Sequence, residues 1–470
     1  MTDPLHTPHD RAAIPLAPSL DHSLADAHMP TRLPLLGTRI VRICMLAIGL
    51  GLVVGCVARL LTMLIGLITN LTFHQTWSTA FSRPAGHHLG AWVIVVPALG
   101  GLVVGAMARW GSRAIRGHGI PEAMEQVLTN ESRIPARMTW LKPVSSAIAI
   151  GTGGPFGAEG PIIATGGALG SFLGQRVPVS ADERKTLLAA GAAAGMAAVF
   201  SAPVSAVLLS IELLLFERRA RSLLPVALAA ATGTGVRFAL EGPGPVFPMP
   251  ALAAVAPQAL IVYALLGLLM GVAGVLITRL TYGIEDAFEK LPIHWMWWPA
   301  LGGVVVGAVG YVMPETLGVG YDNITAVISG QLGLSAMALL AFAKLLSWSV
   351  ALGSGTSGGT LAPLFTIGGA LGGVCGLALA AWSPLHVDPH MAALIGMAAL
   401  FAGASRALMT SAVFVFETTM QPHALLPLLA ACTTAYLVSG LMMRHTIMTE
   451  KIARRGVHVP TDFVADHARH

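Results

Sequence analysis

The sequence GTGGPFGAEGP (residues 151–161) holds a single carboxylate, Glu159, between glycines and prolines, and the segments on both sides of it are strongly apolar. Glycines and Pro161 cannot form the interior of a continuous helix. Non-helical backbone at membrane depth is tolerated only where it is buried in protein or lines a cavity. The sequence therefore predicts a helix that is broken around Glu159, inside a membrane domain.

A new helix is predicted to begin at Pro161, because the run IIATGGALGSFLG (162–174) follows directly. The first amides of a helix attract anions. An ionised Glu159 is itself an anion, so it can occupy such a site when charged and leave it when protonated. A buried acid in a membrane costs about 2.5–3.5 kcal/mol on insertion scales, which favours a functional role over a loop glutamate in an interfacial turn.

Composition places the chain among polytopic membrane proteins. Of its 470 residues, 54% are hydrophobic and 11% are charged, and the mean hydropathy is +0.72. The 53 glycines and 30 prolines indicate close helix contacts and helices broken in the membrane. The net charge of +5 comes without a long basic run or interleaved aromatic residues, so it indicates positive-inside topology and no nucleic-acid partner.

No pattern for enzymatic, metal or redox chemistry is present in the sequence. The four cysteines have no metal-ligand or disulfide-framework spacing, which predicts buried structural thiols. An intramembrane enzyme is the remote alternative, but HExxH and paired aspartates in spans are missing from the sequence. We therefore expect neither enzymatic activity nor a cofactor.

The chain is expected to contain two related halves. A second break, GSGTSGGTLAP (353–363), lies in the position that corresponds to the first, and a third break, GHGIP (117–121), precedes a short helix. Paired breaks are typical of inverted-repeat transporters with a site between the repeats. Several apolar segments are shorter than the ~20 residues of a full span, which predicts re-entrant helices. The expected fold is thus an all-α polytopic membrane protein built from two inverted-topology repeats, with broken, tilted and partly re-entrant helices.

The expected domain boundaries follow changes in composition. They are a disordered cytoplasmic tail (1–36), a transmembrane domain (37–456) made of repeats at about 37–240 and 252–456, and a short tail (457–470). The Pro/Gly-rich link EGPGPVFPMP separates the repeats. Basic residues at Arg113, Arg116 and 451–456 place both termini on the cytoplasmic side. Short termini favour a bacterial inner (plasma) membrane.

Six ordered motifs resemble those of the CLC family of chloride channels and proton-coupled chloride antiporters. They are GHGIPEA (117–123), GAEGP (157–161), GAAAGMAAVFSAPVSAVLLSIE (191–212), GSGTSGGTLAP (353–363), GMAALFAGASRALMTSAVFVFE (396–417) and TIMTEKIARRG (446–456). The resemblance covers about residues 37–456. It implies a homodimer with a separate anion pathway in each subunit, without an appended regulatory domain.

By this resemblance Glu159 is the gating glutamate of an anion pathway. The anion-binding positions implied are His118, Gly119, Ile120, Gly160, Thr360, Leu361 and Met448. His118 stands where the family has a serine, and Met448 stands where it has a tyrosine, so two side-chain contacts to the anion differ. Chloride is the first expectation, while nitrate, fluoride and bicarbonate remain alternatives.

Leu213 bears on the transport mode. Many family antiporters carry an internal proton-transferring glutamate at this position, so leucine favours a channel or a weakly coupled carrier, with a proton-coupled chloride antiporter as the alternative. Glu212 could substitute only if the register differed, and a structural role near Arg218 is favoured. Glu417 is expected to be a structural acid at a helix end, and Lys344 either packs or helps to attract anions.

Overall fold

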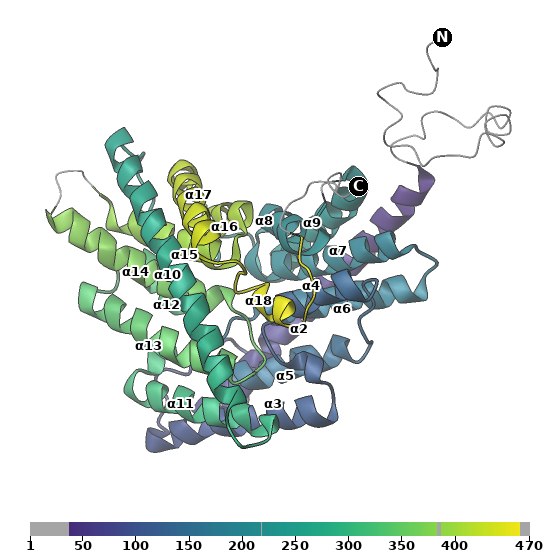
Figure 1. The fold of residues 1–470 in the computed structure, drawn as a ribbon, viewed down its shortest axis with the longest axis horizontal. Coiled ribbons are helices and arrows are strands. Elements are labelled where there is room, and N and C mark those ends of the chain that lie inside the picture. The colour runs from purple at the N-terminus through teal and green to yellow at the C-terminus, as the bar shows by residue number, and fades with distance from the viewer. Residues whose placement is uncertain (1–36, 218, 383–386, 461–470) are drawn as a thin grey trace, which may run out of the picture. The chain divides into compact units, whose positions relative to one another are not determined.

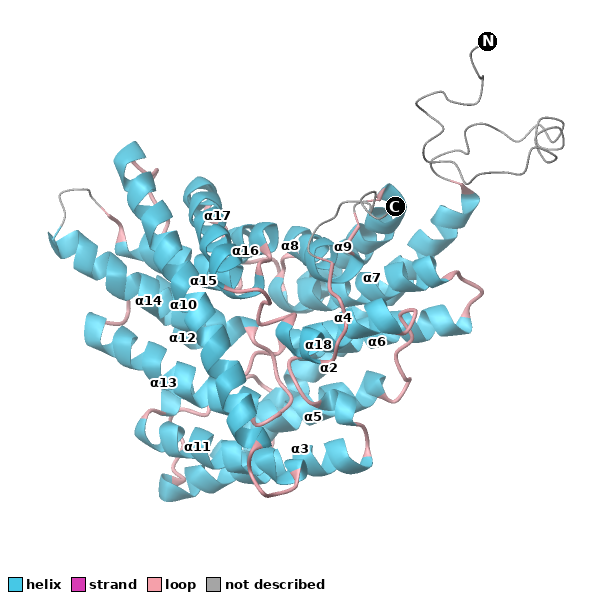
Figure 2. Ribbon diagram, in the orientation of Figure 1, coloured by secondary structure: helices cyan, strands magenta, loops and turns pink. Residues whose placement is uncertain are grey.

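The computed structural model describes residues 37–217, 219–382 and 387–460, and these residues are helical apart from loops and two isolated β-bridges. Figures 1 and 2 show this helical architecture. The chain divides into two compact units, one ending at Arg42 and one beginning at Ile43. The second unit holds every described helix except the start of α2. The predicted tail at 1–36, and the part of the predicted C-terminal tail at 461–470, lie outside the described residues.

The first repeat contains eight α-helices among its described residues. They are α2 (Thr38–Thr69), α3 (Val95–Trp110), α4 (Ile120–Thr129), α5 (Met138–Gly151), α6 (Glu159–Arg176), α7 (Ala181–Phe200), α8 (Pro203–Leu209) and α9 (Ala220–Glu241). Short turns of π- or 3-10-helix adjoin them, namely η2 (Asn70–His74), η3 (Gly90–Ile94), η4 (Arg113–Ile115) and η5 (Ser210–Leu215).

The second repeat has the same helix order, and a terminal helix follows it. Its helices are α10 (Pro257–Glu289), α11 (Trp298–Val312), α12 (Tyr321–Ile328), α13 (Leu334–Gly353), α14 (Leu361–Trp382), α15 (Pro389–Ser405), α16 (Leu408–Thr419), α17 (Leu425–Met442) and α18 (Glu450–Arg454). The shorter turns are η6 (Trp295–Trp297), η7 (Pro314–Thr316) and η8 (Pro422–Ala424). Thus α2–α9 correspond one by one to α10–α17.

Reciprocal contacts between α3 and α11 show that the repeats are related by a pseudo-two-fold axis. A Cβ added at Gly101 would lie 2.1 Å from the carbonyl oxygen of Pro299, and one added at Gly303 would lie 2.4 Å from that of Pro97. Such exchange of equivalent partners is what two-fold symmetry produces. The close approach also explains why glycine is required at both positions.

Two carboxylates extend this symmetry to α8 and α16. Glu417, near the end of α16, accepts hydrogen bonds from the amides of Val204 (2.9 Å) and Ser205 (2.7 Å) at the start of α8. Glu212 in η5 accepts from the amides of Met409 and Thr410, in the first turn of α16, at 2.9 and 3.0 Å. Each repeat thus caps a helix of the other, which confirms a structural role for both acids. Arg218, the partner expected for Glu212, lies outside the described residues.

Helix lengths separate spans from re-entrant elements. Eight helices of the described chain are long and apolar enough to cross a membrane. In contrast, α4 has 10 residues and α12 has 8, well below the ~20 residues that a span requires. The predicted combination of spanning, broken and re-entrant helices is therefore confirmed.

Small residues bring paired helices into direct contact. In α6 and α7, a Cβ added at either Gly166 or Gly191 would meet the carbonyl oxygen of the other residue, at 2.2 and 2.0 Å. Gly368 and Gly396 make the same exchange between α14 and α15, at 2.5 and 2.2 Å. Glycine therefore acts here as the packing surface of a membrane bundle.

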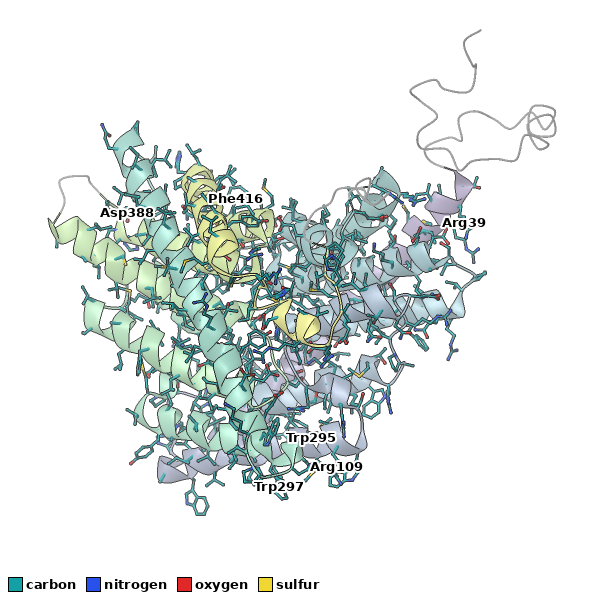
Figure 3. All side chains as sticks on the ribbon, viewed as in Figure 1. Arg39, Arg109, Trp295, Trp297, Asp388 and Phe416 are labelled. Carbon is teal, nitrogen blue, oxygen red and sulfur yellow. The ribbon has the colours of Figure 1, made fainter. Side chains whose placement is uncertain are left out.

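An aromatic cluster marks the end of the bundle near the start of α11. Figure 3 shows Trp295 and Trp297 close to Arg109. The guanidinium of Arg113 lies 4.9 Å from the centroid of the Trp295 ring. Tryptophan beside basic residues is typical of a membrane–water interface.

Candidate anion-binding site

The N-termini of α4, α6 and α14 meet at one point in the interior of the protein. Gly160, in the first turn of α6, is the contact: a Cβ added there would lie 2.1 Å from the carbonyl oxygen of His118 and 2.9 Å from Cα of Gly359. His118 precedes α4, and Gly359 precedes α14. The amide of Gly359 donates to the carbonyl of Gly157 at 3.0 Å, which fixes the two broken segments against each other.

Glu159 is the first residue of α6, and its side chain reaches the N-terminus of α14 in the other repeat. The carboxylate is 1% exposed, and its Oε1 atom accepts a hydrogen bond from the amide of Ala362 at 2.9 Å. The side chain lies over Gly157 and Gly359, where an added Cβ would come within 1.8 and 2.7 Å of carboxylate oxygens. Glu159 therefore occupies the place that a helix N-terminus offers to an anion.

Several buried polar atoms around this point have no hydrogen-bond partner among the described residues. They are Glu159 Oε2, His118 Nδ1 and Thr360 Oγ1. His118 and Thr360 are 3% and 1% exposed. Buried polar groups are rarely left unpaired in native proteins, and each unpaired atom asks for an explanation. A ligand that accepts hydrogen bonds would supply the missing partner for the side chains of His118 and Thr360, once the carboxylate of Glu159 has moved away.

Gly119 is predicted to bind the anion, but in the structure its amide already has a partner. Its amide donates to Glu122 Oε2 at 2.7 Å, and Glu122 Oε1 in turn forms an ion pair with Lys451 of α18 at 2.8 Å. Figure 1 shows α18 close to α4. The Gly119 amide is therefore engaged by a carboxylate, which leaves His118 as the side chain that faces the ligand region at this helix.

A cavity of about 500 Å³ reaches His118 from the surface. Five cationic side chains and two carboxylates line it, which favours entry of anions. They are Arg113, Arg116, Lys451, Arg454 and Arg455, with Glu285 and Glu289. Burial lowers the pKa of the Arg116 guanidinium, and the carboxylate of Glu285 opposes that shift.

Met448 is fully buried and does not line this cavity. The tyrosine found here is Tyr282 of α10, which lines the cavity and donates through its hydroxyl to the carbonyl of Ile447 at 2.8 Å. No sequence pattern singles out Tyr282 as a site residue, because it lies in an unbroken apolar helix far from any motif. A tyrosine thus lines the 500 Å³ cavity, but its hydroxyl is hydrogen-bonded to a backbone carbonyl.

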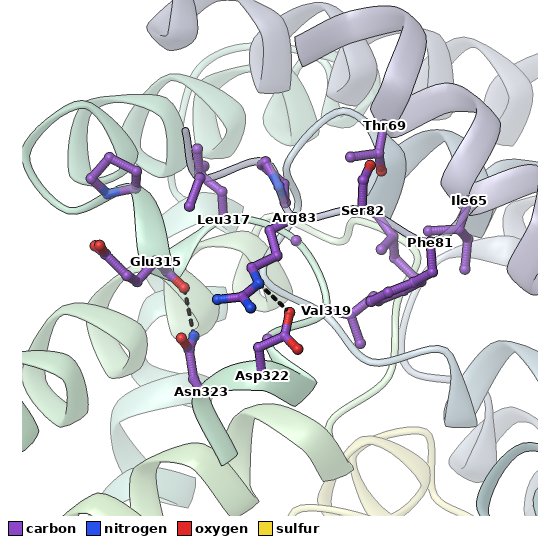
Figure 4. A pocket seen from close by; sticks show the side chains of 16 residues that line it. Ile65, Thr69, Phe81, Ser82, Arg83, Glu315, Leu317, Val319, Asp322 and Asn323 are labelled. Atoms are coloured by element: carbon purple, nitrogen blue, oxygen red, sulfur yellow. Dashed lines mark hydrogen bonds and ion pairs between the residues drawn. The ribbon is translucent and has the colours of Figure 1, made fainter. Parts of the chain in front are cut away.

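A second cavity, of about 110 Å³, is lined by residues of both repeats (Figure 4), and its glycine loop is the counterpart of the one beside the first cavity. Gly318 and Gly320 line it, and they correspond to Gly117 and Gly119 in the first repeat. All four glycines have positive φ, between 68° and 103°. Such backbone favours glycine. Because the repeats are inverted, the two cavities open toward opposite faces of the membrane.

Each of these glycine loops is held by a buried lysine. Lys142 of α5 donates to the carbonyls of Ile115 and Gly117, both at 2.8 Å. Lys344 of α13 donates to the carbonyls of Thr316 and Gly318 at 3.0 and 3.1 Å. Neither lysine lies within ion-pair distance of a carboxylate of the described chain, although Lys142 interacts at longer range with Glu122 and Lys344 with Glu159. The pair therefore combines a structural role with two positive charges outside any direct ion pair.

Leu213 lies in η5 and is 4% exposed, so no carboxylate is present at this position. Glu212, the neighbouring acid, caps α16 as the counterpart of Glu417, which supports the structural role expected for it. A proton path on this face therefore has no acid at position 213 itself.

The fold and the site define a membrane protein that carries anions between two inverted repeats. A family model described as voltage gated chloride channel matches residues 99–440, which is more than half of the chain. The chain therefore belongs to the CLC family, whose members transport anions and are not enzymes.

Relatives and solved structures agree with this family. The chain is 33% identical to an H(+)/Cl(-) exchange transporter ClcA of Cronobacter sakazakii over 72% of this chain and 75% of that protein. It is 29% identical to a ClcB-like chloride channel protein of Ralstonia nicotianae, over 77% of this chain and 85% of that protein. A slow cyanobacterial Cl-/H+ antiporter has the same fold, with a TM-score of 0.79, 24% identity, and coverage of 88% of this chain and 98% of that one.

Proposed function

We propose that the protein exchanges chloride for protons across the membrane, with Glu159 as the group that both fluxes share. The observation that carries this proposal is the carboxylate of Glu159 at the N-terminus of α14, with Oε2 buried and unpaired. One side chain can then exclude the anion when charged and carry a proton when neutral. The exchange transporters of the ClcA type among its relatives support coupling, so antiport is better supported than the channel that Leu213 favoured.

The geometry supports an alternating sequence. Protonation neutralises Glu159 and removes its attraction to the amide of Ala362, so the side chain leaves. An anion then occupies the amides at Leu361 and Ala362 and the free groups of Thr360 and His118. When Glu159 loses its proton, the carboxylate returns and displaces the anion. In the absence of an acid at position 213, water in the 500 Å³ cavity carries protons on that side.

The proposed substrate is chloride, bound at His118, Ile120, Gly160, Thr360 and Leu361, because the Gly119 amide is already bound to Glu122 and Met448 is buried away from the cavity. Nitrate, fluoride and bicarbonate remain second candidates, because His118 and Met448 replace two expected contacts. We place the cavity lined by Arg113 and Lys451 at the cytoplasmic face by the positive-inside rule, which puts both termini there. The protein is proposed to act as a homodimer in a bacterial inner membrane.

The test is reconstitution in liposomes loaded with chloride, with chloride efflux and external pH recorded together under an imposed membrane potential. Proton movement opposite to chloride in a fixed ratio is the expected result. Chloride efflux without protons would identify a channel or an uncoupled carrier instead. If flux starts only when another anion is supplied, the substrate assignment is wrong and the family assignment stands.

The matched variant for this assay is Glu159→Gln, which has nearly the same size but cannot ionise. We expect chloride efflux that no longer depends on pH and proton movement that falls to the level of empty liposomes. Thr165→Ser, about two turns further along α6, is the control, because the Thr165 hydroxyl donates only to the carbonyl of Pro161. Retained proton coupling in Glu159→Gln would contradict the proposed role of Glu159.

A further inference from the structure

Two buried polar atoms without a hydrogen-bond partner face each other across the repeats. One is Oε2 of Glu159, and the other is the hydroxyl of Tyr321, the first residue of α12. The two groups interact electrostatically, although the donor geometry of a hydrogen bond is not met in this conformation. A small rotation of either side chain would pair them.

The ring of Tyr321 is fixed by other aromatic rings, so its hydroxyl has a defined position. The ring stacks on Phe81 at a centroid distance of 6.3 Å, and it meets the rings of Phe200 and Phe247 edge-on at 5.6 and 5.8 Å. Aromatic pairs at these distances and angles are favourable. The phenol is therefore held next to the carboxylate by packing alone, independently of any hydrogen bond.

The hydroxyl of Tyr321 has no counterpart at the corresponding position of the first repeat. The residue that corresponds to Tyr321 in the first repeat is Ile120, which follows Gly119 as Tyr321 follows Gly320. The neighbours Gly320 and Asp322 line the 110 Å³ cavity, where Asp322 pairs with Arg83 at 2.8 Å (Figure 4). Tyr321 thus lies between two residues that line this cavity, while its own buried side chain does not line it.

We propose that the Tyr321 hydroxyl donates a hydrogen bond to Oε2 of ionised Glu159, and that it thereby holds the gate closed and sets the pH at which the gate opens. This inference rests on the proposed function. The other groups that act on the carboxylate are the amides of Leu361, Ala362 and Glu159 itself and the ammonium of Lys344. The backbone of Ala158 and the guanidinium of Arg237 act on the phenol. None of them is a hydrogen-bond partner of Oε2, so the hydroxyl supplies an interaction that they do not replace.

The direction of the effect follows from the donor. A hydrogen bond to the charged form favours that form, so its removal makes protonation easier. Tyr321→Phe removes the hydroxyl and keeps the ring in its aromatic cluster. We expect the external pH that gives half-maximal chloride efflux to rise by about one unit, because hydrogen bonds to charged groups commonly have that effect.

The control is the same chemical change at another buried tyrosine. Tyr263 of α10 is 2% exposed, and its hydroxyl accepts from the amide of Asp388 at 3.1 Å. Tyr263→Phe is expected to leave the pH profile of chloride efflux unchanged. A profile of Tyr321→Phe that superimposes on that of the wild type would overturn the proposal.

Two further measurements separate the hydroxyl from packing and from the proposed function. With 3-fluorotyrosine at position 321, a stronger donor of nearly the same shape, the half-maximal pH should fall instead of rise. In a Glu159→Gln background, Tyr321→Phe should have no further effect on the profile, and a shift that persists there would overturn the proposal. If the wild-type protein moves no anion at all, the proposed function fails instead of this inference.

Discussion

At the scale of single residues, the position of the Glu159 carboxylate depends on the space left by Gly157. A Cβ at residue 157 would lie 1.8 Å from Oε2, and its three nearest atoms all belong to that carboxylate. Gly157→Ala should therefore displace the side chain without disturbing backbone. We expect chloride efflux that depends on pH less than in the wild type, measured in the liposome assay.

The matched control is Gly167→Ala in α6, the helix that follows Gly157, where an added Cβ would make ordinary contacts of 3.5 Å or more. It should keep the wild-type pH profile. If Gly157→Ala also kept that profile, the carboxylate would have room to stay in its closed position, and the steric account of the gate would be wrong.

Glu159 could be predicted from the sequence, whereas its partners could not. An acid between glycines in an apolar region is a local pattern, because the charged residue and the helix-breaking residues can both be read directly from the sequence. Tyr321 and Tyr282 give no such signal, since their importance comes from contacts with residues more than a hundred positions away. Only the packing of the two repeats brings them to the site.

At the scale of elements, the caps of α8 and α16 offer a direct comparison between the repeats. Glu417→Gln keeps the shape of the side chain but removes the charge from the N-terminus of α8, and Glu212→Gln does the same at α16. Each variant should lower the free energy of unfolding by about 1 kcal/mol, the usual size of such capping interactions. Thermal unfolding in detergent would measure both.

The same pair of variants tests whether Glu212 passes protons. If both acids are structural, both variants should be less stable than the wild type and should keep its ratio of protons to chloride. A Glu212→Gln protein of normal stability that had lost proton coupling would show instead that Glu212 replaces the acid absent at Leu213.

Element boundaries were predictable where composition changes sharply, and less so elsewhere. The short helices α5 (Met138–Gly151) and α16 (Leu408–Thr419) have clear limits in the sequence, because glycine, proline and polar residues end them. The helix α12 was not predicted. Its eight residues, YDNITAVI, are too few and too polar to show helical periodicity, and it forms because it packs against α14 and α15.

At the scale of the whole molecule, the inverted repeats place one buried lysine behind each cavity. Lys344 lies behind the glycine loop of the 110 Å³ cavity, and Lys142 lies behind that of the 500 Å³ cavity. Each ammonium fixes its loop through two carbonyls and adds an unpaired positive charge that attracts anions. Since the cavities open to opposite faces, the two charges should act on anions from opposite sides.

The prediction is therefore a sided change in apparent anion affinity. Lys344→Met should raise the half-saturating chloride concentration on one face by about fivefold, which corresponds to about 1 kcal/mol of lost attraction. Lys142→Met should do so on the other face. Transport measured with chloride varied on one side at a time would separate them. Equal effects on both faces, or a lower maximal rate alone, would mean that the lysines only hold the loops, because general loosening of the fold has no reason to distinguish inside from outside.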